Sequence, residues 1–357
     1  MKRRELLLTG GALGALGGCA VPSGRQPVST PAAPDSPLRK IGFASCIDQT
    51  RPQPIWNTVV ADRPDLFLFG GDNVYCELPY SLARLRRAYA QAAESEGMSR
   101  LRRSIAHMAI WDDHDYGVND GGAEFAFKAE SKAEFLDFWK VAADDPRRSR
   151  EGLYHAQTYG PAGRQVQIIM LDGRWFRSPL KVTNQRNAPG KERYVPDADP
   201  AKTMLGEEQW RWLEAQLRQP AQVRLIVSGI QVVTEGHGWE RWGNFPLERQ
   251  RLYQLIARTQ AKGVVFLSGD RHIGALYRES QGTPYPLYEL TSSGITHPWR
   301  DASEAGPNRL GELFTELHFG TVEIDWAAQA LQLRIRDIGG VERRGQLINF
   351  SDLKASA

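Results

Sequence analysis

Four short apolar segments of this 357-residue chain each run directly into side chains that bind hard metal ions. In one of them, Leu66 to Phe69 is followed by two glycines and then by Asp72 and Tyr75. Apolar runs of this length indicate buried strands, and ligands of open α/β sheets bind beyond the carboxyl ends of such strands. The other three segments are Ile41 to Cys46, Met108 to Asp115 and Val264 to His272. Their repeated layout predicts a metal centre at one edge of a sheet.

Strand-like and helix-like segments alternate along most of the chain, which favours an α/β fold. We expect helices over 54–61, 80–98, 130–141, 206–217 and 245–262, and strands over 40–44, 66–69, 103–111, 153–159, 166–171, 223–227, 264–267, 285–290, 318–325 and 330–336. The strands near the C-terminus indicate two packed sheets with helices outside. The polar stretch from Lys181 to Pro200 is long for a loop in a compact domain, so we expect it to rim the site.

The first 18 residues read as an export signal rather than as part of the fold. Arg3 and Arg4 precede an apolar run that is too short to span a membrane, which predicts a twin-arginine signal peptide. Cys19 ends a lipobox-like sequence and would be the lipidated residue; an ordinary cleaved signal with an incidental cysteine is the alternative. We expect a flexible linker over 19–39, a catalytic domain over 40–357, and a lipid-anchored protein on the periplasmic or cell-surface side.

Charge and cysteine content narrow the function classes. A net charge of +3 is close to neutral for this length and gives no basis for sequence-specific nucleic-acid binding. Beyond the signal, Cys46 and Cys76 are the remaining cysteines. In an oxidising compartment they could form a disulfide, or Cys46 could be a metal ligand, and the residues alone leave both open.

The predicted ligands fall into two chemically different sets. A phenol such as Tyr75 binds as phenolate only to a strongly Lewis-acidic ion, which favours Fe³⁺ together with Cys46 and His272. A second ion would contact oxygen atoms, for which Asp113, Asp270 and Asn119 are the candidates, and Ca²⁺, Mg²⁺ or Mn²⁺ suits such ligands. Asp72 would bridge the two ions because a carboxylate has two oxygen atoms.

Four motifs resemble those of the PhoD-like alkaline phosphatases, within the calcineurin-like metallophosphoesterases. They are Gly71 to Tyr75, Trp111 to Asp115, Leu171 to Arg177 and Ser268 to His272, and the resemblance covers roughly 41–320. It implies a four-layer αββα sandwich of two mixed β-sheets flanked by helices, a centre of Fe³⁺ and Ca²⁺, and phosphate ester hydrolysis. It also implies that Cys46, Asp72, Tyr75 and His272 are the iron ligands, which favours ligation over a disulfide, and that His114 is the active-site histidine.

One segment departs from the family pattern. Where the family often has Asp-x-Trp-Asp-Gly-Tyr-Pro, this chain has Glu240 to Pro246, in which both acids are altered. We therefore expect a different substrate pocket. Gln231 and His237 lie where many relatives carry a further histidine ligand, and neither fits cleanly; roles for His237 and His297 stay open.

The function that follows is metal-dependent hydrolysis of phosphate esters at a dinuclear site, with a metal-bound hydroxide attacking phosphorus in line. We expect Arg174 to neutralise a phosphate oxygen, Arg177 and Trp242 to contact the substrate, and His114 to stabilise the transition state or protonate the leaving oxygen. Small-molecule or lipid phosphate esters are the expected substrates. The alternatives are a phospholipase D-like phosphodiesterase acting on membrane or cell-wall phosphodiesters, and a non-catalytic lipoprotein that binds ligand.

Overall fold

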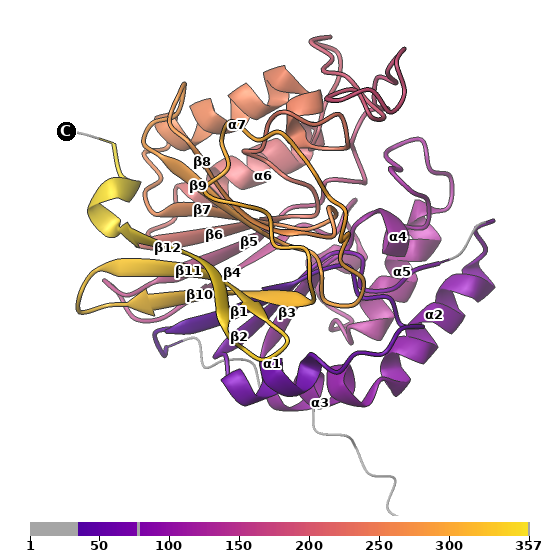
Figure 1. Cartoon of the computed structure of the whole chain (residues 1–357), viewed down its shortest axis with the longest axis horizontal. Coiled ribbons are helices and arrows are strands. Elements are labelled where there is room, and N and C mark those ends of the chain that lie inside the picture. Colours follow the sequence, from indigo (N-terminus) through magenta and orange to yellow (C-terminus); the bar gives the residue numbers. More distant parts are fainter. Residues whose placement is uncertain (1–34, 77–78, 356–357) are drawn as a thin grey trace, which may run out of the picture.

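The computed structural model describes residues 35–76 and 79–355, which form two six-stranded sheets packed face to face (Figure 1). The first sheet contains, in spatial order, β12 (Glu342–Asn349), β11 (Ala330–Asp337), β10 (His318–Asp325), β1 (Lys40–Ala44), β2 (Leu66–Gly70) and β3 (His107–Ile110). Within it β1, β2 and β3 are parallel, so their carboxyl ends meet at one edge.

The second sheet contains, in spatial order, β4 (His155–Tyr159), β5 (Val166–Met170), β6 (Val223–Ser228), β7 (Val264–Ser268), β9 (Leu287–Ser292) and β8 (Gly274–Glu279). Its four central strands are parallel, while β4 and β8 pair antiparallel at the two edges. Strands β5, β6 and β7 are buried along their whole length, as expected for parallel strands covered on both faces.

Helices cover the outer faces of both sheets. On the side of the first sheet lie α1 (Trp56–Asp62), α2 (Leu82–Glu94), α3 (Glu96–Ser104) and α5 (Lys128–Phe138), and on the side of the second lie α6 (Gly206–Leu217) and α7 (Pro246–Arg258) (Figure 1). Between α1 and β2 the buried rings of Trp56, Phe67 and Phe69 pack together, with 4.8 Å between the centroids of the two phenylalanines. The expected sandwich of two mixed sheets flanked by helices is confirmed.

Several predicted boundaries are wrong. The helix expected over 80–98 is broken at Ser95, whose backbone is extended and whose hydroxyl donates to Gln53 Oε1 at 2.8 Å. The strand expected from residue 103 begins at His107, because Arg103 lies in the last turn of α3. Strands β8 and β12 were not predicted; β12 alternates exposed and partly buried residues at a sheet edge, so it lacks an apolar run.

None of the helices in the described ranges is long and apolar enough to cross a bilayer. The predicted signal over 1–18, Cys19 and most of the linker lie outside the described residues.

Candidate metal centre

The predicted ligand segments of both sheets meet at one place. The Cys46 amide donates to the Gly71 carbonyl (3.3 Å), which joins the turns after β1 and β2. The turn after β7 is joined to the turn after β6, because the Gly269 amide donates to the Gly229 carbonyl (2.9 Å). A Cβ on Gly269 would lie 2.5 Å from Ser45 Oγ, so the absence of a side chain lets the two sheets approach here.

Four of the predicted ligands have a left-handed backbone. Their φ angles are 63° at Cys46, 50° at Asp72, 68° at Asp270 and 56° at His272. Non-glycine residues are uncommon in this region, and each one held there costs about 1–3 kcal/mol. Strained residues cluster at functional sites, so their convergence marks this edge of the sandwich as the candidate site.

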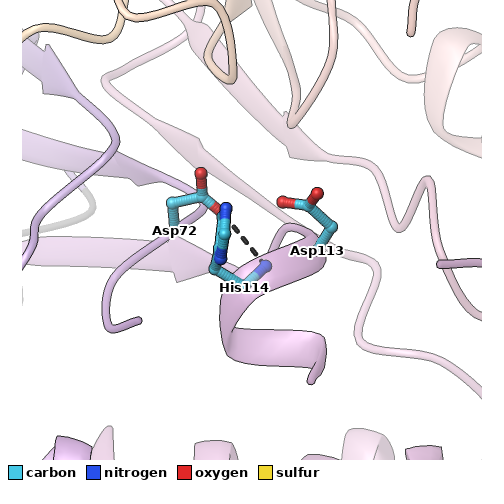
Figure 2. A group of neighbouring side chains, drawn as sticks. All are labelled: Asp72, Asp113 and His114. Carbon is cyan, nitrogen blue, oxygen red and sulfur yellow. Dashed lines mark hydrogen bonds between the residues drawn. The ribbon is translucent and has the colours of Figure 1, made fainter. Parts of the chain in front are cut away.

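Asp72 is in contact with three of the other predicted site residues. Its Oδ2 accepts a hydrogen bond from the Tyr75 hydroxyl (3.1 Å) and lies 3.5 Å from Cys46 Sγ. Its Oδ1 accepts from the backbone amide of His114 (3.2 Å), as Figure 2 shows. The two carboxylate oxygens therefore face different groups, which is the arrangement that a bridging ligand requires.

Asp113 lies at the centre of a larger group of acids. It is the first residue of the one-turn helix α4 (Asp113–Tyr116). Three overlapping sets have ligand atoms within 4.8 Å of one another, and Asp113 belongs to all three: Asp72, Asp113 and His114; Asp112, Asp113 and Asp270; Asp113, Asp120 and Glu240. Figure 2 shows the carboxylates of Asp72 and Asp113 on either side of His114.

This group of buried carboxylates fits a cation. The pKa values of Asp72, Asp112 and Asp270 lie well above the ordinary range, mainly because the groups are buried, with the neighbouring Asp113 adding to the effect. Asp113 Oδ1 and Asp112 Oδ2 are buried without a hydrogen-bond partner among the described residues. Charged oxygens in such a position are stable only when paired or when they coordinate a metal.

Two histidines stand next to the Cys46, Asp72 and Tyr75 group. The His272 and His297 rings lie 4.2 Å apart, and the His297 ring lies 4.9 Å from that of Tyr75. Burial, and then His297, lower the pKa of His272 to about 3, so its imidazole is neutral, the form that binds metals. His297, which the sequence left open, therefore belongs to the site. His237 does not, since its Nε2 is engaged by Gln231 Oε1 (3.0 Å).

The expected roles of Arg174 and Arg177 are wrong. Arg174 is only 1% exposed, and its guanidinium pairs with Asp112 (2.6 Å) and Glu240 (2.7 Å). Arg177 is fully buried and pairs with Glu240 at 3.1 Å. Both guanidinium groups compensate buried acids instead of facing the space where a substrate would bind.

Two other expected site residues lie outside the group of candidate metal ligands. Trp242 is fully buried and donates its indole N–H to Ser228 Oγ (3.0 Å), so it is a core residue and not part of the mouth. Asn119 is exposed in the wall of a pocket, whereas the next residue, Asp120, is the one in the acidic group. Its backbone amide also donates to Asp113 Oδ2 (2.7 Å).

Comparisons with known proteins agree with this geometry. A family model described as PhoD-like phosphatase matches residues 41–334. This chain belongs to the PhoD-like phosphatase family. A curated relative from Bacillus subtilis (strain 168), alkaline phosphatase D, is 23% identical over 212 residues, which is 54% of this chain and 35% of the relative.

Solved structures confirm the fold. A structure of PhoD has a TM-score of 0.70 at 17% identity and is matched by 90% of this chain over 70% of its own length. A purple acid phosphatase from yellow lupin seeds has a TM-score of 0.60 at 11% identity, over 90% of this chain and 56% of that one. The chain thus spans about a third of the curated relative, and 56% to 70% of these structures.

Three acids of the site were not predicted from the sequence. Asp112, Asp120 and Glu240 all belong to the central group. Asp120 lies in the polar, glycine-rich loop at 117–122, and Glu240 lies in the segment that departs from the family pattern. Both positions could therefore have been considered as site residues from the sequence. The pKa of Asp120 is raised to about 7, first by burial and then by Glu240.

The loop over 181–200 does rim the site. Its residues Val182 and Tyr194 form an isolated antiparallel β-bridge, and the Tyr194 amide donates a hydrogen bond to the Gly238 carbonyl (2.7 Å). The Tyr194 hydroxyl donates to Asp120 Oδ2 (2.7 Å), so the loop contacts the acidic group directly. No local pattern in the sequence identified Tyr194.

A pocket of about 380 Å³ lies in front of the site. Its wall is formed by Asp48, Gln49, Thr50, Tyr75, Cys76, His114, Val118 and Asn119.

Cys46 and Cys76 are not joined to each other, so the disulfide interpretation is wrong for this structure. The thiol of Cys46 stays available to the site, and its pKa is raised by burial and by Asp72.

Proposed function

We propose that this protein hydrolyses phosphate esters at a metal centre built around Asp72 and Asp113. The observation that carries the proposal is the contact of Asp72 with Cys46 and Tyr75 on one side and with the Asp113–His114 turn on the other. Membership of the PhoD-like phosphatase family supports the same reaction class.

The residues fit two kinds of ion. A thiol, a phenol and an imidazole from Cys46, Tyr75 and His272 suit Fe³⁺, and the carboxylates of Asp113 and Asp270 suit Ca²⁺, with Mg²⁺ or Mn²⁺ as alternatives. Asp72 would be shared. When bound, such ions supply Lewis-acid activation of water and neutralisation of phosphate charge.

The remaining chemistry depends on the chain itself. His114 is partly exposed in the pocket wall, and its ring lies 4.1 Å from that of Tyr75. A partly exposed imidazole beside the acids is suited to donate a proton to the leaving oxygen of the ester. Arg174 would contribute indirectly, by offsetting the charge of Asp112 and Glu240.

The test uses p-nitrophenyl phosphate and bis-p-nitrophenyl phosphate, with metal analysis of the same samples. We expect hydrolysis of at least one of them, and the ratio of the two rates separates a monoesterase from a diesterase. Asp72→Asn should lower the rate by several orders of magnitude and deplete the metal, because a neutral amide bridges two cations poorly. Asp325→Asn, at the last residue of β10, should do neither. Wild-type metal content without hydrolysis of either ester would contradict the proposal.

We further propose that the protein is exported by the twin-arginine route and anchored by a lipid on Cys19. The support is the Arg3-Arg4 pair and the lipobox-like sequence before Cys19. Cys19→Ser should move the protein from the membrane fraction to the soluble fraction with its activity unchanged. Unchanged fractionation would argue against the anchor.

A further inference from the structure

A second cavity adjoins the pocket in front of the metal centre. The second cavity has a volume of about 290 Å³ and is lined by Gln49, Thr50, Tyr75, Arg84, Arg87, Ala88 and Gln91. Gln49, Thr50 and Tyr75 line both cavities, so the two cavities adjoin, and we refer to them together as the groove between the metal centre and helix α2. We call the part beside α2 the outer half of the groove.

The shared wall is held in place by hydrogen bonds. The Gln49 side chain donates from Nε2 to the Tyr75 carbonyl (2.9 Å) and accepts from the Tyr75 amide at Oε1 (2.8 Å). The Tyr75 hydroxyl in turn donates a hydrogen bond to Asp72 Oδ2. The wall between the metal ligands and the outer half is therefore formed in advance of binding, which lowers the entropic cost of holding an extended ligand.

The two ends of the groove have opposite charge. At the inner end, the lining residues Tyr75 and His114 adjoin the acidic group around Asp113, which fits cations. The outer half is lined by Arg84 and Arg87 of α2, and Arg87 is exposed with no ion pair or side-chain hydrogen bond among the described residues. Asp48, in the wall, is already paired with Arg51 at 2.9 Å. A ligand that fits this pattern has one phosphate at the metals and a further anionic group toward α2.

We propose that the outer half of the groove binds a second phosphate group of the same substrate molecule through Arg87. The substrate class is then a molecule with two phosphates, either a diphosphorylated small molecule or a short phosphodiester oligomer. A guanidinium suits this role because its N–H groups match phosphate oxygens. The inference rests on the proposed function only in placing the scissile phosphate at the metal centre.

Helix α2 supplies a matched control. Arg86 precedes Arg87 and is also exposed, but it pairs with Glu134 of α5 at 2.8 Å and does not line the groove. Arg86→Gln and Arg87→Gln therefore make the same change in charge on neighbouring residues of one helix. Circular dichroism should show both variants folded, because neither side chain is buried.

The binding test is independent of turnover. Isothermal titration calorimetry compares propylphosphonate with linear alkane-α,ω-bisphosphonates of increasing length, none of which can be hydrolysed. For the wild type and Arg86→Gln, we expect one chain length to bind about fivefold tighter than the monophosphonate, with the gain shrinking at high salt. Arg87→Gln should lose that gain. The proposal is overturned if no length gives a gain, if the gain survives in Arg87→Gln, or if Arg86→Gln loses it equally.

The turnover test identifies the source of the second phosphate. Arg87→Gln should lower kcat/KM about fivefold, through KM, for either a diphosphorylated sugar or a glycerol phosphate oligomer, and should leave p-nitrophenyl phosphate unchanged. The substrate whose kcat/KM falls in Arg87→Gln identifies the substrate class. An Arg87-dependent gain in binding without any hydrolysis would refute the proposed function and keep the subsite, whereas hydrolysis without that gain would refute the subsite alone.

Discussion

Replacement of Arg174 by methionine tests the corrected role of this arginine. The guanidinium is buried between Asp112 and Glu240 at 2.6 and 2.7 Å, and its Nη1 also donates to the Gly121 carbonyl (3.3 Å). Methionine has a similar length and no charge, so the substitution leaves the buried Asp112 without its paired cation and leaves Glu240 with Arg177 alone. If Arg174 were instead a phosphate ligand, the substitution would change KM and hardly affect stability.

The expected loss of stability follows from the burial of the pair. Removing one partner of a buried ion pair destabilises a protein by about 3–5 kcal/mol, because an uncompensated charge stays buried. A domain of this size loses roughly 2 °C of Tm per kcal/mol, so the drop in Tm should be roughly 6–10 °C. The loss should be smaller at pH 5 than at pH 8. Burial raises the pKa of Asp112 and Arg174 lowers it, so without the arginine this pKa lies further above its unfolded value. The native state of the variant then binds more protons than the unfolded state and gains stability as the pH falls.

Differential scanning calorimetry of metal-depleted protein measures this directly. Arg211→Met is the matched control, because Arg211 is exposed on α6 and its side chain bonds only to a backbone carbonyl among the described residues; it should shift Tm by less than about 1 °C. An Arg174→Met variant with the Tm of the wild type and a raised KM would refute the reasoning and restore the phosphate-binding role.

Three further predictions concern the iron, the core and the crowding at the site. Tyr75→Phe should remove most of a visible charge-transfer band, and a colourless, iron-free and fully active wild type would contradict the Fe³⁺ assignment. Burial lowers the pKa of His318 to about 4, so the contribution of its neutral imidazole to the free energy of unfolding is fully present above pH 6.5 and is lost as the pH falls toward 4, by up to about 3 kcal/mol. In urea unfolding, the stability of His318→Gln should therefore depend less steeply on pH than that of the wild type. An equal slope would refute this. A Cβ on Gly229 would lie 2.2 Å from Asp112 Oδ1, so Gly229→Ala should displace that carboxylate and lower activity at least about 100-fold. A Cβ on Gly173 would meet nothing within 4 Å, so Gly173→Ala should leave activity nearly unchanged. Similar rates for both variants would be evidence against this crowding.

The convergence of Cys46, Asp72, Asp270 and His272 could be predicted from the sequence because its signals are local. An apolar run that ends in Gly70-Gly71 and then Asp72 shows in a few residues both that a strand is buried and that it ends at a ligand. The same holds for Val264 to His272. The tertiary structure added that these turns hold Cys46, Asp72, Asp270 and His272 in a left-handed backbone, and these four residues had already been predicted from the sequence.

The role of a long charged side chain could not be read in this way, because it depends on partners far away in the sequence. Arg174 meets Asp112 at a separation of 62 residues and Glu240 at 66, and Tyr194 reaches Asp120 across 74. An arginine in a polar motif is equally compatible with a substrate contact and with a buried ion pair until the packing of the two sheets sets its exposure. The sequence by itself therefore determined the strand ends and the types of side chain that follow them. The tertiary structure alone decided which charges face the pocket and which compensate one another inside, since burial is a property of the assembled layers and not of any one segment.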